Sequence, residues 1–445
     1  MFKVTRTKIK LPKLQQSLPV LLVDMPHSQS VTTMFLANAG SRYESKKEQG
    51  LAHFFEHMVF KGTKKYPNSQ TLSVALDSVG ADFNAFTSKE YTGYYVKTAR
   101  EHVGLAIDVL SDMLFQPLLE QKEIDKEKGV IVEELNMYVD NPAYHVSDVF
   151  DQLFFASEDL AHSIVGRKAT IRSFNSQDFL DFTKRFYNPD NLLLVVAGGL
   201  EGLKDSLQDL LQEALLKIPE GRAQGTHVQP RLQDATSSLA TQKGFSKQRF
   251  KLIKRDSQQA HFVMAWPSLH THHEDRYVLQ VLSTIIGGNM SSRLFAKVRE
   301  ERGLAYYVNS NLDFYHDVGA FGCSAGVDLL RAAEAVEVSR AVFEDVASGR
   351  EPITADELAK AKEYLRGKTL LSLESSNSVA QFFGLKQVLR GDQLDVDEIL
   401  SSLQKVSLQD LQRVASQVID ANQPRLAIIG DFSESVAKAL RSSIN

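Results

Sequence analysis

The sequence predicts an α+β protein of two homologous domains, each a mostly antiparallel sheet layered with helices. At 445 residues the chain is long enough for two domains of roughly 200 residues. Several strand-like segments follow one another before helical patterns begin, which favours an α+β fold over a doubly wound parallel sheet. The same succession of segments then occurs a second time, displaced by roughly 230 residues.

Three pairs of strand-like segments carry the repeat. VTTMFLANAG at 31–40 is placed like HFVMAWPSL at 261–269, YTGYYVKT at 91–98 like VGAFGCSAG at 318–326, and LLLVVAGG at 192–199 like LAIIGDF at 426–432. Amphipathic helical patterns lie between them, at Val103 to Leu114, Ile124 to Val139 and Leu329 to Val346. Any two domains of mixed strands and helices share some of this rhythm, so on the repeat alone that alternative stays open.

A domain boundary is expected at 219–247. This stretch is rich in Gly, Gln, Ser and Thr and has no sustained periodicity, which is typical of a linker. The predicted organisation is therefore an N-terminal domain at 1–218, a linker, and a homologous C-terminal domain at 248–445.

The composition is that of a folded, soluble protein, with 43% hydrophobic and 24% charged residues. A formal net charge of -4 gives no field that would recruit nucleic acid or an anionic membrane. Cys323 is the only cysteine, so no internal disulfide is expected. No apolar signal region follows the N-terminal lysines, and the apolar run at 18–23 is far shorter than the roughly 20 residues of a membrane span. We therefore expect a cytoplasmic protein without a membrane span.

The segment GLAHFFEHM at 50–58 carries the strongest chemical motif. It has no helix breaker after Gly50, and on a helix His53, Glu56 and His57 share one face. Two imidazoles one turn apart can bind one zinc ion, and a carboxylate beside them can accept a proton from water on the metal. The pattern is H-x-x-E-H, the inverse of H-E-x-x-H. It predicts His53 and His57 as ligands and Glu56 as general base, against the alternative of an amphipathic helix with surface His and Glu.

A third ligand is expected, because a catalytic zinc ion usually has three protein ligands and one open position. The segment EIDKEKGVIVEEL at 123–135 predicts a helix with Glu127 and Glu134 two turns apart on one face. Glu134 can bind the metal while Glu127 supports it, as carboxylates around metal sites do. Acidic residues on a charged helix are otherwise its solvated face, and Glu133 competes with Glu134 by position.

These motifs resemble those of the inverzincins, the pitrilysin and mitochondrial processing peptidase family. The resemblance covers nearly the whole chain and rests on HFFEHMVFKGT at 53–63, NAFTSKEYTGYY at 84–95, EKGVIVEEL at 127–135, FYNPDNLLLVVAGG at 186–199 and GGNMSSRLFAKVREERGLAYYV at 287–308. It implies His53, His57 and Glu134 as zinc ligands, Glu56 as base and Glu127 as the supporting glutamate. Zinc is favoured over cobalt or manganese by ligand type and family. The family fold is a pair of homologous α+β domains.

The resemblance also implies residues that contact a substrate. Arg299 and Tyr306 match an arginine and tyrosine pair that approaches the substrate, and such groups can stabilise charge developing on a carbonyl oxygen. Asn84, Ala85 and Phe86 match an edge strand that adds an extended peptide to its sheet, a mode that tolerates many sequences. The expected activity is therefore that of a zinc endopeptidase acting on extended or unfolded peptides.

The expected assembly follows from the same resemblance. Pitrilysins carry four such domains in one chain, so two chains of this length should close around a substrate. Because the zinc motif and the Arg299 and Tyr306 pair are both present, we expect a homodimer that completes each site in trans. A catalytic subunit that needs a different partner chain, and a non-catalytic structural or binding subunit, are the alternatives. The dense cluster of His270, His272, His273 and Glu274 is interpreted as solvated.

Overall fold

The computed structural model describes residues 2–11, 15–155, 158–222, 245–391, 395–419 and 424–444. The chain forms two compact units, each assembled from three segments. The first unit comprises Met1–Leu135, Ser163–Gln229 and Leu370–Gln393, and the second Asn136–His162, Pro230–Thr369 and Leu394–Asn445. Each unit is described by itself below.

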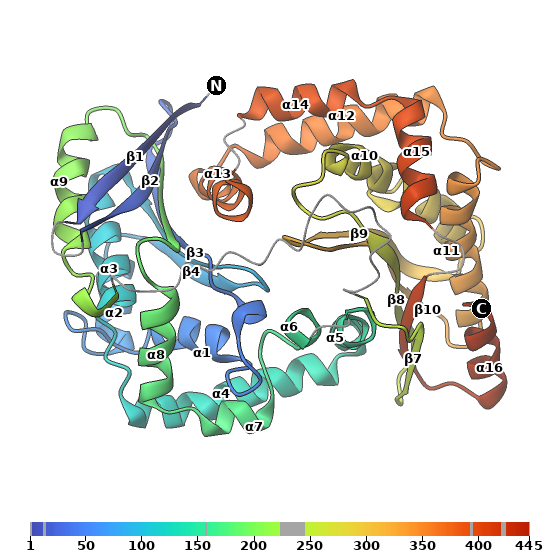
Figure 1. Ribbon diagram of the computed structural model, residues 1–445, viewed down its shortest axis with the longest axis horizontal. Helices are drawn as coiled ribbons and strands as arrows, with labels where there is room; N and C mark the ends of the chain where they lie inside the picture. Colours follow the sequence, from blue (N-terminus) through green and yellow to red (C-terminus); the bar gives the residue numbers. More distant parts are fainter. Residues whose placement is uncertain are drawn as a thin grey trace. The chain divides into compact units, whose positions relative to one another are not determined.

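The first unit is built on a six-stranded sheet with the order β1-β2-β6-β3-β5-β4 (Figure 1). The strands are β1 (Lys3–Leu11), β2 (Gln16–Asp24), β3 (Ser30–Ala37), β4 (Asp82–Thr87), β5 (Thr92–Ala99) and β6 (Leu192–Gly198). Neighbouring strands are antiparallel except β2 and β6, which are parallel. The central strands β3 and β6 are almost entirely buried, whereas β1 and β4 form the edges of the sheet.

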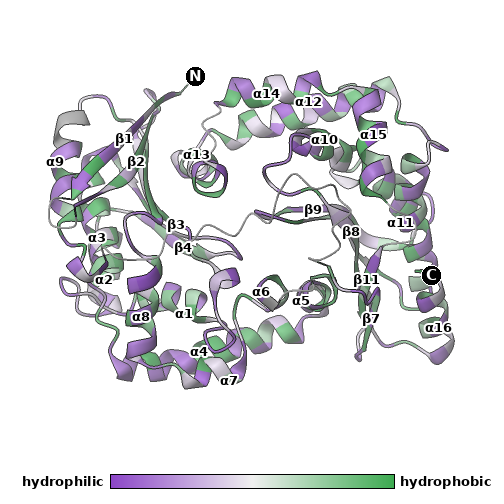
Figure 2. Ribbon diagram, in the orientation of Figure 1, coloured by the Kyte–Doolittle hydropathy of each residue, from purple (hydrophilic) through white to green (hydrophobic). Residues whose placement is uncertain are grey.

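Helices accompany this sheet in the first unit. They are α1 (Leu51–Met58), α2 (Ser69–Asp77), α3 (Val103–Phe115), most of α4 (Gln121–Asp140), α7 (Lys168–Ser173), α8 (Ser176–Phe186), α9 (Lys204–Leu215) and α13 (Ser376–Arg390), with short 3-10 turns at Ser41–Tyr43, Arg100–His102 and Glu220–Arg222. Figure 2 shows that the longer helices carry both hydrophobic and hydrophilic residues, as helices with one packed face do.

The second unit repeats the same sheet topology with one strand fewer. Its order is β7-β11-β8-β10-β9, and only the β11 and β7 pair is parallel. The strands are β7 (Phe250–Lys254), β8 (Ala260–Ser268), β9 (Ala305–Phe314), β10 (Gly319–Val327) and β11 (Arg425–Gly430). This order matches β2-β6-β3-β5-β4 strand for strand. The α+β class, the duplication and the mostly antiparallel sheets are therefore confirmed.

The helices of the second unit are α5 (Pro142–Phe154), α6 (Glu158–Ala161), α10 (Arg276–Gly287), α11 (Ala332–Ala347), most of α12 (Ala355–Ser372), α14 (Val396–Lys405), α15 (Leu408–Val418) and α16 (Glu434–Ser442). One turn of π-helix, η6, spans Phe295–Glu300. Within the described residues, no helix is both long and apolar enough to cross a membrane.

Each unit includes a helix from the other half of the sequence. Helix α13 packs on β3 and β6, where its Gly384 leaves so little room that a Cβ would lie 2.5 Å from Leu36 Cδ1. Helix α5 packs on β8 and β11 through a cluster that includes Phe150 and Phe154. The units thus differ from the contiguous domains predicted at 1–218 and 248–445. The physical reason is that a helical pattern shows which face is apolar, not which sheet will cover it. Most of the predicted linker lies outside the described residues.

Candidate metal centre

Helix α1 presents the H-x-x-E-H residues, and its start is fixed by local geometry. Gly50 precedes the helix with a φ of 97°, and a Cβ there would collide with the carbonyl of Val165. The Glu44 carboxylate accepts hydrogen bonds from the backbone N–H groups of Gly50 and Ala52, at 2.8 and 2.7 Å. A carboxylate at this place satisfies donors that a helix N-terminus leaves unpaired. The predicted helix is confirmed.

Helix α4 supplies the carboxylates. Ile124, Ile131 and Leu135 bury one face of the helix, as does the almost fully buried Glu127. Glu134 lies two turns after Glu127 and is partly exposed, whereas its neighbour Glu133 is exposed. Because adjacent residues of a helix point in different directions, Glu133 and Glu134, the two candidates for the third ligand, lie on different faces of α4.

His53, His57 and Glu134 bring their ligand atoms within 4.8 Å of one another. His53 Nε2 lies 3.5 Å from Glu134 Oε1, and His57 Nε2 lies 3.4 Å from Glu134 Oε2. Donor atoms bound tetrahedrally at 2.0–2.1 Å to one zinc ion would be roughly 3.3 Å apart, so the two separations between histidine and Glu134 atoms suit a zinc ion. Elsewhere in the described parts of the chain, no three His, Cys, Asp or Glu side chains meet this way, the cluster at His270 to Glu274 included.

Contacts behind the ligands orient one imidazole. His57 Nδ1 lies 2.9 Å from Glu127 Oε1, and Lys61 Nζ lies 2.6 Å from Glu127 Oε2. A carboxylate on Nδ1 favours a proton there and leaves Nε2 for a metal. The sequence predicts that Glu127 supports Glu134; in the structure its carboxylate contacts His57 instead. His53 differs, since its buried Nδ1 has no hydrogen-bond partner among the described residues.

The charges of the group favour a cation between its members. Burial lowers the pKa of His57, but hydrogen bonds to Glu127 and Glu134 outweigh it and raise the pKa to about 9. Hydrogen bonds from His53 and His57 lower the pKa of Glu134 to about 2. The carboxylates thus favour positive charge at the His57 imidazole, and a bound metal ion would take the place of that proton.

Glu56 is held by a residue of the edge strand. Thr87 Oγ1, at the end of β4, donates a hydrogen bond of 2.5 Å to Glu56 Oε2. Asn84, Ala85 and Phe86 lie on the same strand. Strand β4 is at the edge of its sheet, as the sequence predicts, and it packs beside α1.

Arg299 and Tyr306 lie together in the second unit. Arg299 is on η6 and Tyr306 on β9, with the guanidinium carbon 5.8 Å from the centre of the tyrosine ring. The Tyr306 side chain is exposed, with 73% of the residue's surface accessible. The predicted pair therefore exists as a local arrangement of a cation and a phenol.

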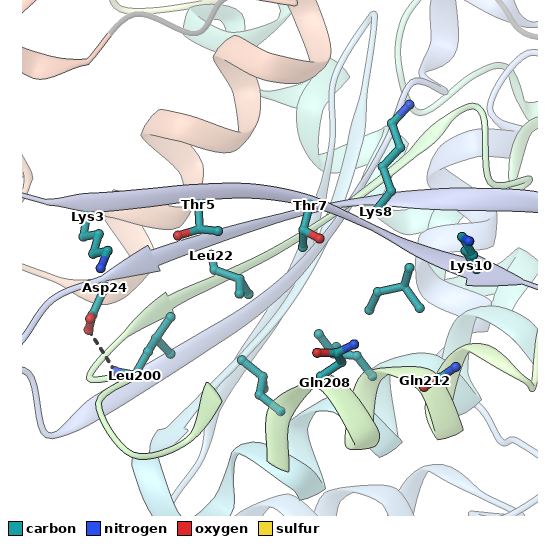
Figure 3. A pocket seen from close by; sticks show the side chains of 13 residues that line it. Lys3, Thr5, Thr7, Lys8, Lys10, Leu22, Asp24, Leu200, Gln208 and Gln212 are labelled. Atoms are coloured by element: carbon teal, nitrogen blue, oxygen red, sulfur yellow. Dashed lines mark hydrogen bonds between the residues drawn. The ribbon is translucent and has the colours of Figure 1, made fainter. Parts of the chain in front are cut away.

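A separate cavity of about 590 Å³ lies in the first unit between β1, β2 and α9 (Figure 3). Leu22, Leu200, Leu207 and Leu211 line it together with Thr and Lys side chains. None of the residues of the candidate metal centre borders this cavity.

Sequence reasoning missed Lys61 and Thr87. Lys61 lies in the motif HFFEHMVFKGT and Thr87 in the motif NAFTSKEYTGYY. Their place inside these two motifs is the sequence feature that could have indicated a role for them. A lysine and a threonine have no motif chemistry of their own, so their contacts with Glu127 and Glu56 emerge only from the fold.

The fold and the donor group define a class, a duplicated α+β scaffold with a His-His-Glu metal group in its first unit. The family description "Insulinase (Peptidase family M16)" matches residues 19–168, and "Peptidase M16 inactive domain" matches residues 173–365. The chain belongs to peptidase family M16. The first match includes all three ligand residues and Glu56, and the second includes Arg299 and Tyr306.

Relatives align along almost the whole chain. A Streptomyces coelicolor protein named as an uncharacterized zinc protease is 33% identical over 436 residues, 98% of this chain and 92% of its own length. A Bacillus subtilis protein with the same description is 34% identical over 92% of this chain and 95% of its own length. Two solved structures share the fold with a TM-score of 0.83 and cover 96% of this chain: a protease from Helicobacter pylori at 21% identity over 100% of its chain, and a peptidase M16 inactive domain from Pseudomonas fluorescens at 16% over 98%.

Proposed function

We propose that this protein is a zinc-dependent endopeptidase that hydrolyses extended or unfolded peptides. The observation that carries the proposal is the meeting of His53, His57 and Glu134 donor atoms, with Glu56 on the same helix as the two histidines. The relatives' names support a zinc protease, and membership of family M16 supports a peptidase.

Zinc, when bound by His53, His57 and Glu134, would lower the pKa of water and polarise the scissile carbonyl. Glu56 then takes a proton from the attacking water and passes it to the leaving amine. Thr87 donates a hydrogen bond to one oxygen of the Glu56 carboxylate, which restricts the position of the proposed proton acceptor. Glu127 orients the His57 ring through Nδ1.

An extended peptide is the substrate that the edge strand β4 would accept. Its Asn84, Ala85 and Phe86 would pair with a peptide backbone, so unfolded segments are preferred over folded proteins. Arg299 and Tyr306 would stabilise the negative charge on the carbonyl oxygen. We infer that these residues come from the partner chain of a homodimer, because one chain of this length has only two family domains. If sedimentation at the assay concentration shows that the active protein is a monomer, the homodimer is contradicted.

The experiment is cleavage of a mixed set of unstructured peptides by the purified full chain. Activity should disappear when a chelator removes the metal and should return with about one equivalent of zinc. Full activity in the metal-free protein would refute the zinc mechanism. Activity that appears only after a different M16 chain is added would favour the catalytic subunit of a heterodimer over the homodimer.

A further inference from the structure

His57, Glu127 and Lys61 form a chain of contacts in which Glu127 lies between the other two side chains. The Glu127 side chain is only 6% exposed and uses both carboxylate oxygens, Oε1 for His57 Nδ1 and Oε2 for Lys61 Nζ. A buried carboxylate with one free oxygen can turn about its last torsion, since that torsion is broad. With both oxygens bound, the Glu127 carboxylate has one orientation.

The backbone fixes the point from which Lys61 reaches Glu127. The Lys61 N–H donates to Met58 O at 3.1 Å, which continues the end of α1. The next residue, Gly62, has a φ of 148°, and a Cβ there would lie 2.8 Å from Pro67 O. Gly62 O also accepts a hydrogen bond from Leu118 N at 3.0 Å. The chain on both sides of Lys61 is therefore held in place.

We propose that Lys61 is a positioning residue of the metal centre, which holds Glu127 against His57 Nδ1 so that His57 Nε2 stays directed at the metal. This inference rests on the proposed zinc site. Among the described residues, Lys61 pairs with Glu127 and not with a proposed ligand or Glu56. We therefore expect Lys61 to act on zinc affinity only through Glu127.

The test is the zinc dissociation constant of the full chain, measured by competition with a chromophoric chelator. Lys61→Met and Lys61→Gln should each weaken zinc binding about tenfold, the lower end for loss of such supporting contacts. Lys61→Arg keeps the positive charge and should restore most of the affinity. Lys65→Met is the matched control, because Lys65 lies in the same loop but pairs with Asp108, and it should bind zinc like the wild type.

A double-mutant cycle separates this role from a general effect on folding. In a Glu127→Gln background, Lys61→Met should change zinc affinity less than twofold, because the group it acts on is already altered. An equal tenfold loss in both backgrounds would overturn the inference, and so would an unchanged affinity of Lys61→Met and Lys61→Gln. If the wild type binds no zinc while it remains folded, the metal site itself is wrong, and the role of Lys61 falls with it.

Discussion

Thr87 Oγ1 and Glu56 Oε2 lie 2.5 Å apart and join the edge strand β4 to α1, the helix that carries His53 and His57. The hydroxyl donates to the carboxylate, so one oxygen of Glu56 has a fixed direction. The strand proposed to bind the peptide and the proposed general base are thereby mechanically linked.

Replacement of Thr87 by valine keeps the shape of the side chain and removes the donor. We expect kcat to fall about tenfold, in line with the roughly 1.5 kcal/mol that a hydrogen bond to a charged group contributes, with zinc content unchanged. Thr87→Ser retains the hydroxyl and should stay within about threefold of the wild type. Steady-state kinetics with a quenched fluorescent peptide measure both variants, and an unchanged kcat in Thr87→Val would show that Glu56 is oriented by other contacts.

The neighbouring glutamates of α4 offer a matched test of the third ligand. Glu134 Oε1 and Oε2 face the two His Nε2 atoms, whereas Glu133 is exposed on another face of the helix. Glu134→Gln should therefore lose about tenfold or more in zinc affinity, and Glu133→Gln should bind zinc like the wild type. The zinc content of each variant is measured after dialysis against a weak chelator. Loss of zinc from Glu133→Gln but not from Glu134→Gln would make Glu133 the third ligand.

Two adjacent tyrosines test the proposed oxyanion donor. Tyr306 is exposed, whereas the Tyr307 hydroxyl lies 3.1 Å from His261 Nδ1 within the second unit. Tyr306→Phe should lower kcat about a hundredfold without a change in zinc content, as loss of an oxyanion donor does. Tyr307→Phe should leave kcat unchanged and lower the free energy of unfolding by about 1 kcal/mol. Equal kcat values for Tyr306→Phe and the wild type would remove Tyr306 from the mechanism.

The Glu357 carboxylate should make the stability of the second unit depend on pH. Burial opposes ionisation of Glu357, but hydrogen bonds from Arg293, at 2.7 and 2.8 Å, and from the backbone of Thr354 hold its pKa at about 2. Because this pKa is below the unfolded value, the stabilisation is complete above about pH 4.5 and is lost as the pH falls towards 2.

Glu357→Gln removes this contribution. At pH 7 the variant should have a free energy of unfolding lower than that of the wild type by on the order of 2 kcal/mol, and therefore a lower unfolding temperature. This difference in the free energy of unfolding should shrink steadily between pH 5 and pH 3. Thermal unfolding followed by circular dichroism at several pH values measures it. A difference that is constant with pH would mean that the lost contact is one of packing and not of charge.

The sequence predicts the fold class and the grouping of His53, His57 and Glu134 because both depend on short-range patterns. The spacing of His53 and His57 places them on one helix face, and the seven-residue spacing of Glu127 and Glu134 does the same on α4. The order of the strand-like segments at 31–40, 91–98 and 192–199 reappears in the second half, and the matching sheet orders confirm it.

Contacts between distant segments could not be predicted in this way. Amphipathicity shows that α5 and α13 each bury one face, but the sheet that each covers is decided by tertiary packing. Glu127 contacts His57 with one carboxylate oxygen and Lys61 with the other, and both contacts join residues that are far apart in the sequence. The hydrogen bond between Thr87 and Glu56 likewise depends on the register of β4 beside α1.

The most direct test of the proposed chemistry is peptide cleavage by Glu56→Gln, with bound zinc quantified in the variant and in the wild type. Glu56 is the proposed proton acceptor but not a ligand, so the variant should retain about one zinc ion per chain and should lose activity by at least about a hundredfold. A zinc-loaded Glu56→Gln protein that cleaves peptides at the wild-type rate would contradict the account.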